Sequence, residues 1–220
     1  GEALEKLETG VDRAVLSTDD PSVYRYDQMD TNSSENSSMQ MGTNSTAYYF
    51  SVASSSIANF FDEMYLNTPW EQHYNNLDGR TILDRLASVK YFVVKKGKES
   101  DLPYGYSRLS GEAEKNGKTY LAYADEDALP LGYTYDSWIS REDYDKMTVT
   151  EKQQALLQGV VLDDSSLPET ETHFNDREVS YYTSEGKGCR LKNGKVVVTQ
   201  ENAQLKLVFE GEENAETYLI

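Results

Sequence analysis

The stretch of residues 118–136 limits most strictly what this chain can fold into. Residues 119–124 and 132–135 alternate aromatic residues with small or polar ones, which is the period-2 pattern of a half-buried β-strand. Between them, Pro130 lacks a backbone donor and forces Leu129 into an extended conformation, so a helix cannot connect the two strands. We therefore expect the chain to fold around a β-sheet that contains both.

Further strands are predicted on either side of this stretch. Residues 89–94 form the most apolar run of the chain, which predicts a central strand covered on both faces. Asn116-Gly117 predicts a hairpin between residues 106–114 and 118–123, because both turn positions need a positive φ. The expected mixed sheet consists of residues 23–29, 47–52, 89–94, 119–124 and 132–135.

Helices are predicted where apolar residues recur with helical spacing. They are expected at residues 56–66, 80–88 and 149–162, where they would cover the sheet. Ser140 with Asp143, and Thr148 with Glu151, have the spacing of N-caps that begin helices. The first helix is predicted to bury one apolar stripe, made of Ile57, Phe60, Phe61, Met64 and Tyr65.

The composition changes near residue 170. Residues 163–171 have the acidic, Ser/Pro-containing character of a linker, and short strands at even spacing follow, with a second hairpin signal at Asn193-Gly194. We predict the α+β class: a mixed-sheet α/β domain over residues 1–163, then a β-sandwich-like all-β region over residues 164–220. With only about five short strands, this sandwich is either incomplete or pairs with the first part of the chain. They are predicted at residues 179–183, 188–191, 195–200, 204–210 and 217–220.

Charge and composition exclude several classes of function. The net charge of -17 argues against a nucleic-acid partner and equally against docking on an anionic lipid surface. No run approaches the roughly 20 apolar residues that a membrane helix needs. Cys189 is the only cysteine, so no internal disulfide forms. Since the chain begins at Gly1 without Met, we expect it to be an excised part of a longer protein.

The sequence contains no recognisable catalytic or metal-binding motif. His73 and His173 stand far apart without further ligands nearby, so we expect no zinc, no other metal and no cofactor. The densest acidic cluster, residues 125–127, either faces solvent or binds Ca²⁺. Carboxylates are abundant, so the composition alone does not exclude a pair of them that hydrolyses glycosidic bonds.

One irregular segment has the composition of a sugar-binding surface. Trp70 and Tyr74 have ring faces suited to pyranose rings, and the amides of Asn75 and Asn76 suit sugar hydroxyls. The alternative is that Trp70 covers the edge of the core. The polar loop of residues 30–46 is the second candidate surface, and a plain surface loop is its alternative.

Three segments also resemble a known family. They read LDGRTILDRLASVKYFVVKKG, ADEDALPLGYTYD and SWISREDYDKMTVTEKQQALLQGVVLDD. Across residues 79–163 they resemble the extracytoplasmic part of the bacterial YfhO-like family, which consists of multispanning membrane proteins of the glycosyltransferase-C type. The segments are packing patterns and carry no catalytic signature.

The resemblance implies a role in the cell envelope. The parent would be a glycosyltransferase of cell-envelope polymers such as lipoteichoic acid, and this part would lie on the extracellular face of the cytoplasmic membrane of a Gram-positive bacterium. Its implied partners are the membrane-spanning portion of its own chain and a cell-envelope glycan or lipid-linked acceptor. The family's catalytic acid is expected in loops that this chain lacks, so we assign no catalytic residue and expect the fragment to position its acceptor. A secreted or wall-attached carbohydrate-binding module is the alternative.

Overall fold

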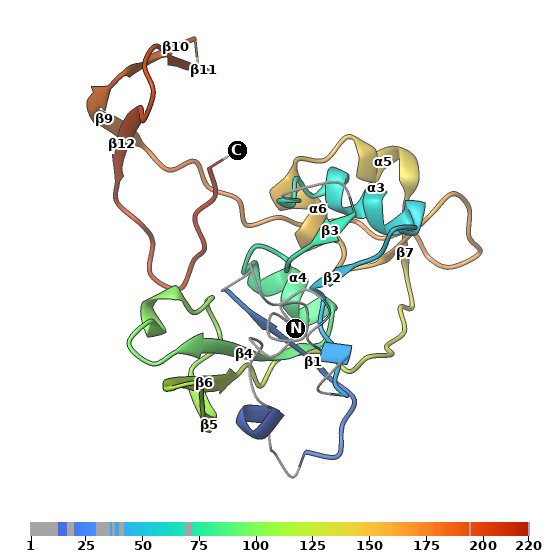
Figure 1. The fold of residues 1–220 in the computed structure, drawn as a ribbon. Helices are drawn as coiled ribbons and strands as arrows, with labels where there is room; N and C mark the ends of the chain where they lie inside the picture. Colours follow the sequence, from blue (N-terminus) through green and yellow to red (C-terminus); the bar gives the residue numbers. More distant parts are fainter. Residues whose placement is uncertain are drawn as a thin grey trace. The chain divides into compact units, whose positions relative to one another are not determined.

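The computed structural model describes residues 13–16, 20–29, 36, 38–39, 42–68, 72–193 and 195–219, without the side chains of residues 13–14 and 183–185 (Figure 1). The chain divides into two compact units, Gly1–Phe174 and Asn175–Ile220. The predicted linker therefore lies within the first unit. Its backbone pairs there with the strand at Trp138, whose N–H donates to the carbonyl of Pro168 (3.0 Å) and whose carbonyl accepts from the N–H of Thr170 (2.7 Å).

The first unit contains a four-stranded mixed sheet. Its strands are β1 (Arg25–Gln28), β4 (Val89–Lys95), β6 (Lys118–Ala124) and β5 (Arg108–Lys115), in the order β1-β4-β6-β5. β1 runs parallel to β4, and the other neighbours are antiparallel. The predicted α+β class, the mixed sheet and the central position of residues 89–94 are confirmed.

β4 is central because both of its faces are apolar and covered. Tyr91 and Val93 pack against Val15 and Leu16 of the short 3-10 helix η1 (Arg13–Leu16). On the other face, Phe92 and Val94 pack with Tyr106 and Leu121. Figure 1 shows α4 (Thr81–Leu86) on one side of the sheet and η1 on the other. Each fully buried side chain of this size contributes about 1.5–3 kcal/mol to folding.

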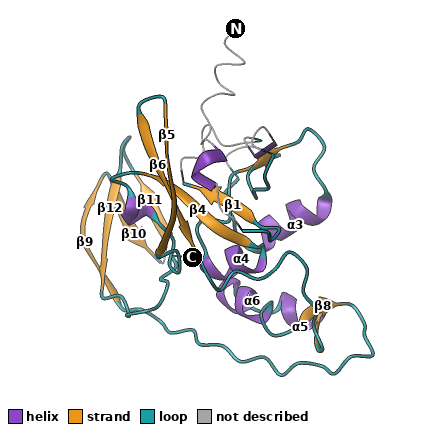
Figure 2. Ribbon diagram, turned by 90° about the horizontal axis from the view of Figure 1, so that it is seen from below, coloured by secondary structure: helices purple, strands orange, loops and turns teal. Residues whose placement is uncertain are grey.

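A second core lies between the helices of the first unit (Figure 2). Besides α4, these are α3 (Ser55–Glu63), α5 (Arg141–Asp145) and α6 (Val149–Ala155). Of the stripe predicted on the first helix, Phe61 and Met64 are buried, whereas Ile57 and Tyr65 are exposed. Tyr65 leaves the stripe because the helix has already ended and its φ is +50°.

Both predicted N-caps are confirmed. The Ser140 hydroxyl accepts from the backbone N–H of Asp143 (3.1 Å), and Thr148 forms a capping box with Glu151. The second of these helices, α6, ends seven residues earlier than the predicted 149–162. β-Branched residues follow it and form β8 (Val160–Leu162), which pairs in parallel with β7 (Trp138–Ser140).

Two predicted strands of the main sheet lie elsewhere. Instead of residues 47–52 and 132–135, the fourth strand is β5. β2 (Tyr48–Tyr49) pairs with β3 (His73–Tyr74) in a separate small sheet. Residues 132–135 form no strand. Their tyrosine hydroxyls bind the ends of helices instead: Tyr133 donates to the carbonyl of Leu86 at the end of α4, and Tyr135 to that of Leu156 after α6. These carbonyls would otherwise lack an intrahelical partner.

The second unit is all-β, as predicted, and has little burial. β9 (Tyr181–Lys187) pairs with β12 (Gln204–Phe209), and β10 (Cys189–Lys192) with β11 (Lys195–Val198). The described residues 217–219 form no strand. None of the side chains described in this unit is buried, so over these residues the two strand pairs enclose no sandwich core.

Candidate functional site

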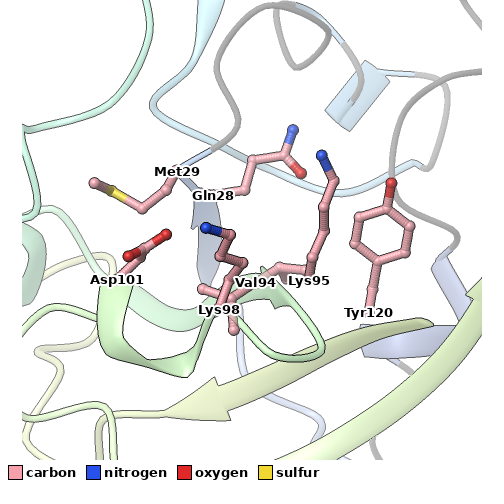
Figure 3. Close-up of a pocket in the computed structure, with 8 residues that line it drawn as sticks. Gln28, Met29, Val94, Lys95, Lys98, Asp101 and Tyr120 are labelled. Carbon is pink, nitrogen blue, oxygen red and sulfur yellow. The ribbon is translucent and has the colours of Figure 1, made fainter. Parts of the chain in front are cut away.

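A hollow of about 250 Å³ lies at the carboxyl ends of β1 and β4 (Figure 3). Because these strands are parallel neighbours, their carboxyl ends share one edge of the sheet, which is where open sheets commonly bind ligands. The residues that line the hollow are Gln28, Met29, Val93, Val94, Lys95, Lys98, Asp101 and Tyr120.

The charged wall of the hollow is a tight turn after β4. The backbone N–H of Lys98 donates to the carbonyl of Lys95 (2.9 Å), and that of Asp101 donates to the carbonyl of Lys98 (3.0 Å). The turn continues into the 3-10 helix η3 (Glu99–Asp101). This spacing places three charged residues on one side of the turn. Lys96 lies outside the hollow and pairs with Glu112 (3.0 Å).

The opposite wall comes from β1 and β6. Tyr120 lies directly across from Lys95 in the ladder of β4 and β6. Figure 3 shows the Gln28 amide and the Lys95 and Lys98 ammonium groups around one open space, with Asp101 and Tyr120 on opposite sides of it. The hollow therefore combines two cations, one carboxylate, one amide and one phenol.

The end of β1 is held firmly by buried polar groups. The carbonyl of Gln28 accepts from the side-chain amide of Asn76 (3.1 Å). Next to it, the buried Asp27 carboxylate accepts from the Ser45 hydroxyl (2.8 Å) and from the backbone N–H of Thr46 (3.1 Å) as well as its hydroxyl. Burial nevertheless raises the pKa of Asp27 to about 6, because these hydrogen bonds offset only part of the desolvation.

The arrangement favours binding over bond cleavage. The ammonium groups suit phosphate or carboxylate oxygens, while the amide, the phenol and Asp101 suit hydroxyl groups. Asp101 is the only carboxylate among the lining residues, so the two carboxylates required for glycoside hydrolysis are not assembled here. Among the residues that the structure describes, no group of three or more His, Cys, Asp or Glu side chains could hold a metal ion.

Of the four residues predicted to bind glycan, the structure describes Tyr74, Asn75 and Asn76. Trp70 lies outside the described residues. Tyr74 is buried in the helical core, where its ring stacks on Tyr48 (centroids 4.8 Å apart) and meets Phe61 edge-on (4.6 Å). A ring covered in this way presents no face to a sugar. Asn75 is half-buried.

Asn76 does not line the hollow but supports Gln28, which does. It is buried, and besides its bond to Gln28 its side-chain oxygen accepts from the backbone N–H of Asp78 (2.8 Å). Asn76 thus positions the β1 end. The described part of the loop 30–46 has the same role, since the carbonyl of Asn44 accepts from the N–H of Tyr26 (3.0 Å). Of that loop, residues 30–35, 37 and 40–41 lie outside the described residues.

The acidic cluster 125–127 is engaged by arginines. Arg85 binds Asp125 through two hydrogen bonds (2.6 and 3.1 Å) and pairs with Asp127 (3.0 Å), while Glu126 pairs with Arg108. The hydrogen bond to Asp125 also raises the pKa of Arg85. Asp125 is buried and joins α4 to the end of β6, whereas Glu126 and Asp127 are exposed, so two of the three carboxylates face solvent as the first of the two interpretations expects.

Neither of the candidate surfaces predicted from the sequence includes Lys95 or Lys98. The usable signal was modest: two lysines three residues apart, directly after the central strand of a strongly acidic chain. Gln28 and Tyr120 carried no signal, because only the pairing of β1, β4 and β6 brings them together.

Comparisons with known proteins identify relatives of the whole chain. A family model described as bacterial membrane protein YfhO matches residues 2–220. A Bacillus subtilis (strain 168) protein named uncharacterized protein YfhO is 25% identical over 193 residues, which cover 86% of this chain and 22% of that relative. The chain therefore spans about a fifth of the relative's length. No solved structure matches it. Within the described residues, no helix has the length and apolar character to cross a membrane.

Proposed function

Because the chain belongs to the YfhO family of bacterial membrane proteins, we propose that it is the outward-facing domain of a membrane-embedded glycosyltransferase. The enzyme would modify cell-envelope polymers of the lipoteichoic-acid type. In this proposal the domain lies on the extracellular face of the cytoplasmic membrane and works beside the membrane-spanning portion of its own chain, holding the acceptor while that portion carries out the transfer.

The hollow beside β1 and β4 is the observation that carries the proposal. Polyol-phosphate polymers present alternating phosphates and hydroxyls. Lys95 and Lys98 suit the phosphates, and Gln28, Asp101 and Tyr120 suit the hydroxyls. In a chain of net charge -17, two lysines beside one open hollow favour a local anionic ligand.

Binding of a short poly(glycerol phosphate) oligomer to the 220-residue chain tests this function. We expect Lys98→Gln to weaken binding by about ten-fold, since a hydrogen bond to a charged group contributes roughly 1.5–3 kcal/mol. Lys96→Gln is the matched control, because Lys96 lies outside the hollow. Equal losses in the two variants would mean non-specific attraction and would contradict the assigned site.

Binding of neutral glycans distinguishes the proposed function from the alternative, a carbohydrate-binding module. A carbohydrate-binding module would bind an uncharged oligosaccharide as well as the phosphate polymer, independently of Lys98. The proposed domain should prefer the phosphate polymer, and its preference should weaken as salt screens the charges.

The side of the membrane on which this domain lies is tested with the full-length protein in cells. A Lys98→Cys variant should react with a membrane-impermeant maleimide in intact cells, because this side chain is exposed in the structure. A Cys189→Ala background removes the thiol of these 220 residues, and the same background without Lys98→Cys measures labelling elsewhere in the full-length protein. Labelling only after cell lysis would refute the extracellular placement.

A further inference from the structure

The β10–β11 hairpin has two chemically different faces. In its register Cys189 pairs with Val198, and Leu191 with Val196. Directly paired residues share a face, and successive residues alternate between faces. One face therefore carries Cys189, Leu191, Val196 and Val198, and the other carries Arg190, Lys192, Lys195 and Val197.

At one end of the apolar face, Cys189 is half-buried and its thiol donates to the carbonyl of Gln204 (3.1 Å). The rest of the face is open: Leu191 is 40% exposed, Val196 50% and Val198 64%. A two-stranded hairpin alone is marginally stable in water, and these three side chains bury too little apolar surface to stabilise it. A surface that covers them would stabilise the hairpin.

The hairpin also reverses the charge of the chain. Residues 189–198 contain three basic residues, Arg190, Lys192 and Lys195, and no acidic residue, a net charge of +3, whereas the whole chain carries -17. The charge of the whole chain, which disfavours anionic surfaces, thus conceals a local region that favours them.

We propose that the β10–β11 hairpin docks on an anionic membrane surface. Leu191, Val196 and Val198 enter the boundary between headgroups and acyl chains. Arg190, Lys192 and Lys195 lie within about a Debye length of the lipid phosphates and extend towards them. The proposal rests on the hairpin and on membership of a membrane protein family, and it is independent of glycosyl transfer.

A lipid surface complements both faces. A soluble polyanion would neutralise Arg190, Lys192 and Lys195 and leave the aliphatic side chains in water. A second copy of the chain that paired hairpin to hairpin would cover the aliphatic side chains, but it would bring its own Arg190, Lys192 and Lys195 to the same place. The interfacial layer of an anionic bilayer provides an apolar boundary and negative charge side by side.

Vesicle binding by the 220-residue chain tests the proposal. We expect sedimentation with phosphatidylcholine vesicles that contain about 30% phosphatidylglycerol, and weak binding to pure phosphatidylcholine. Because each basic residue near an anionic surface contributes about five-fold in affinity, the triple variant Arg190→Gln, Lys192→Gln, Lys195→Gln should bind on the order of 100-fold more weakly. Val196→Asp with Val198→Asp should abolish binding.

The other Asn-Gly hairpin supplies the controls. Lys115→Gln with Lys118→Gln removes charge beside the β5–β6 turn, and Leu131→Asp places a charge at another exposed apolar site. These variants should bind like the unchanged chain. The triple glutamine variant changes only exposed positions, so a folded hairpin in its NMR spectrum separates loss of attraction from loss of structure.

Four results would overturn the proposal. The first is no binding to either vesicle, and the second is equal binding to both. The third is binding to soluble poly(glycerol phosphate), lost in the triple variant, without binding to vesicles. The fourth is concentration-dependent dimerisation that Val196→Asp with Val198→Asp abolishes, again without vesicle binding.

Discussion

The chain contains two hairpins with the same turn signal and different surroundings. In both turns the asparagine has a φ of +52°, at Asn116 between β5 and β6 and at Asn193 between β10 and β11. β6 pairs with β4 on its other side, and its Leu121 and Ala122 are buried. β10 and β11 pair only with each other, and their described side chains all remain at least partly exposed.

The difference shows what a turn can and cannot determine. An Asn-Gly turn selects the hairpin geometry, because its positions tolerate positive φ. It contributes no buried apolar surface, which is the main source of stability. The β5–β6 hairpin obtains that surface from β4 on one edge and from η1 on one face. The β10–β11 hairpin still needs a partner.

The largest expected effect comes from removing a buried ring. Phe92→Ala should lower the free energy of unfolding of the first unit by about 3–5 kcal/mol, because Phe92 is fully buried and its loss leaves a cavity. Urea unfolding followed by tryptophan fluorescence measures this, since Trp70 and Trp138 both belong to the first unit. Val196→Ala in the β10–β11 hairpin should change the free energy of unfolding measured in this way by no more than about 0.5 kcal/mol. Similar losses of stability in the two variants would contradict the contrast between the buried sheet and the exposed hairpin.

A pH titration sharpens the comparison, because Asp27 in the first unit is fully buried. Its pKa is raised from 3.8 to about 6, so the folded state holds the proton more tightly than the unfolded state. The contribution of Asp27 to the free energy of unfolding is fully present below pH 3.8 and is lost as the pH rises to about 6. The free energy of unfolding should fall by roughly 3 kcal/mol over this range.

Asp27→Asn isolates this contribution, since the amide does not titrate. The difference in unfolding free energy between the unchanged chain and the variant should fall as the pH rises from about 4 to 7. A difference independent of pH would show that Asp27 has an ordinary pKa.

The next largest loss of stability is expected where the backbones of β5 and η1 pack closely. Gly111 in β5 lies against η1, and a Cβ at this position would lie 2.0 Å from the carbonyl oxygen of Val15. Gly111→Ala should therefore destabilise the first unit by about 1–3 kcal/mol, because a backbone atom must move. Gly211 in the second unit has open space around its Cβ position, so Gly211→Ala should be neutral. A neutral Gly111→Ala would mean that η1 does not pack on β5 in solution.

The smallest expected change is in the turns themselves. Asn116→Ala and Asn193→Ala should each cost about 1 kcal/mol, since alanine tolerates a positive φ less well than asparagine. Amide hydrogen exchange should show that β5–β6 keeps its protection, whereas β10–β11 loses it. Equal protection in both variants would show that the second hairpin has buried support.

Local chemistry was readable from the sequence where the interacting residues are neighbours. Ser140 with Asp143, and Thr148 with Glu151, form hydrogen bonds within one turn, so their spacing was sufficient. The apolar run at residues 89–94 likewise predicted a strand buried on both faces.

Pairing partners were less predictable, because a strand pattern does not say which edge it joins. Residues 47–52 have a strand pattern, yet Tyr48 and Tyr49 pair with β3. Tyr133 and Tyr135 alternate as in a strand, but their hydroxyls bind helix carbonyls.

The candidate site was decided by tertiary structure alone. Gln28 lies far from Lys95 in the sequence, and they share a hollow because β1 runs parallel to β4. Tyr74 and Asn76 have the composition of a sugar-binding surface, but burial turned one into core and the other into a support of β1. Composition specifies which groups are available, whereas burial and strand pairing, which join distant residues, decide which of them reach a ligand.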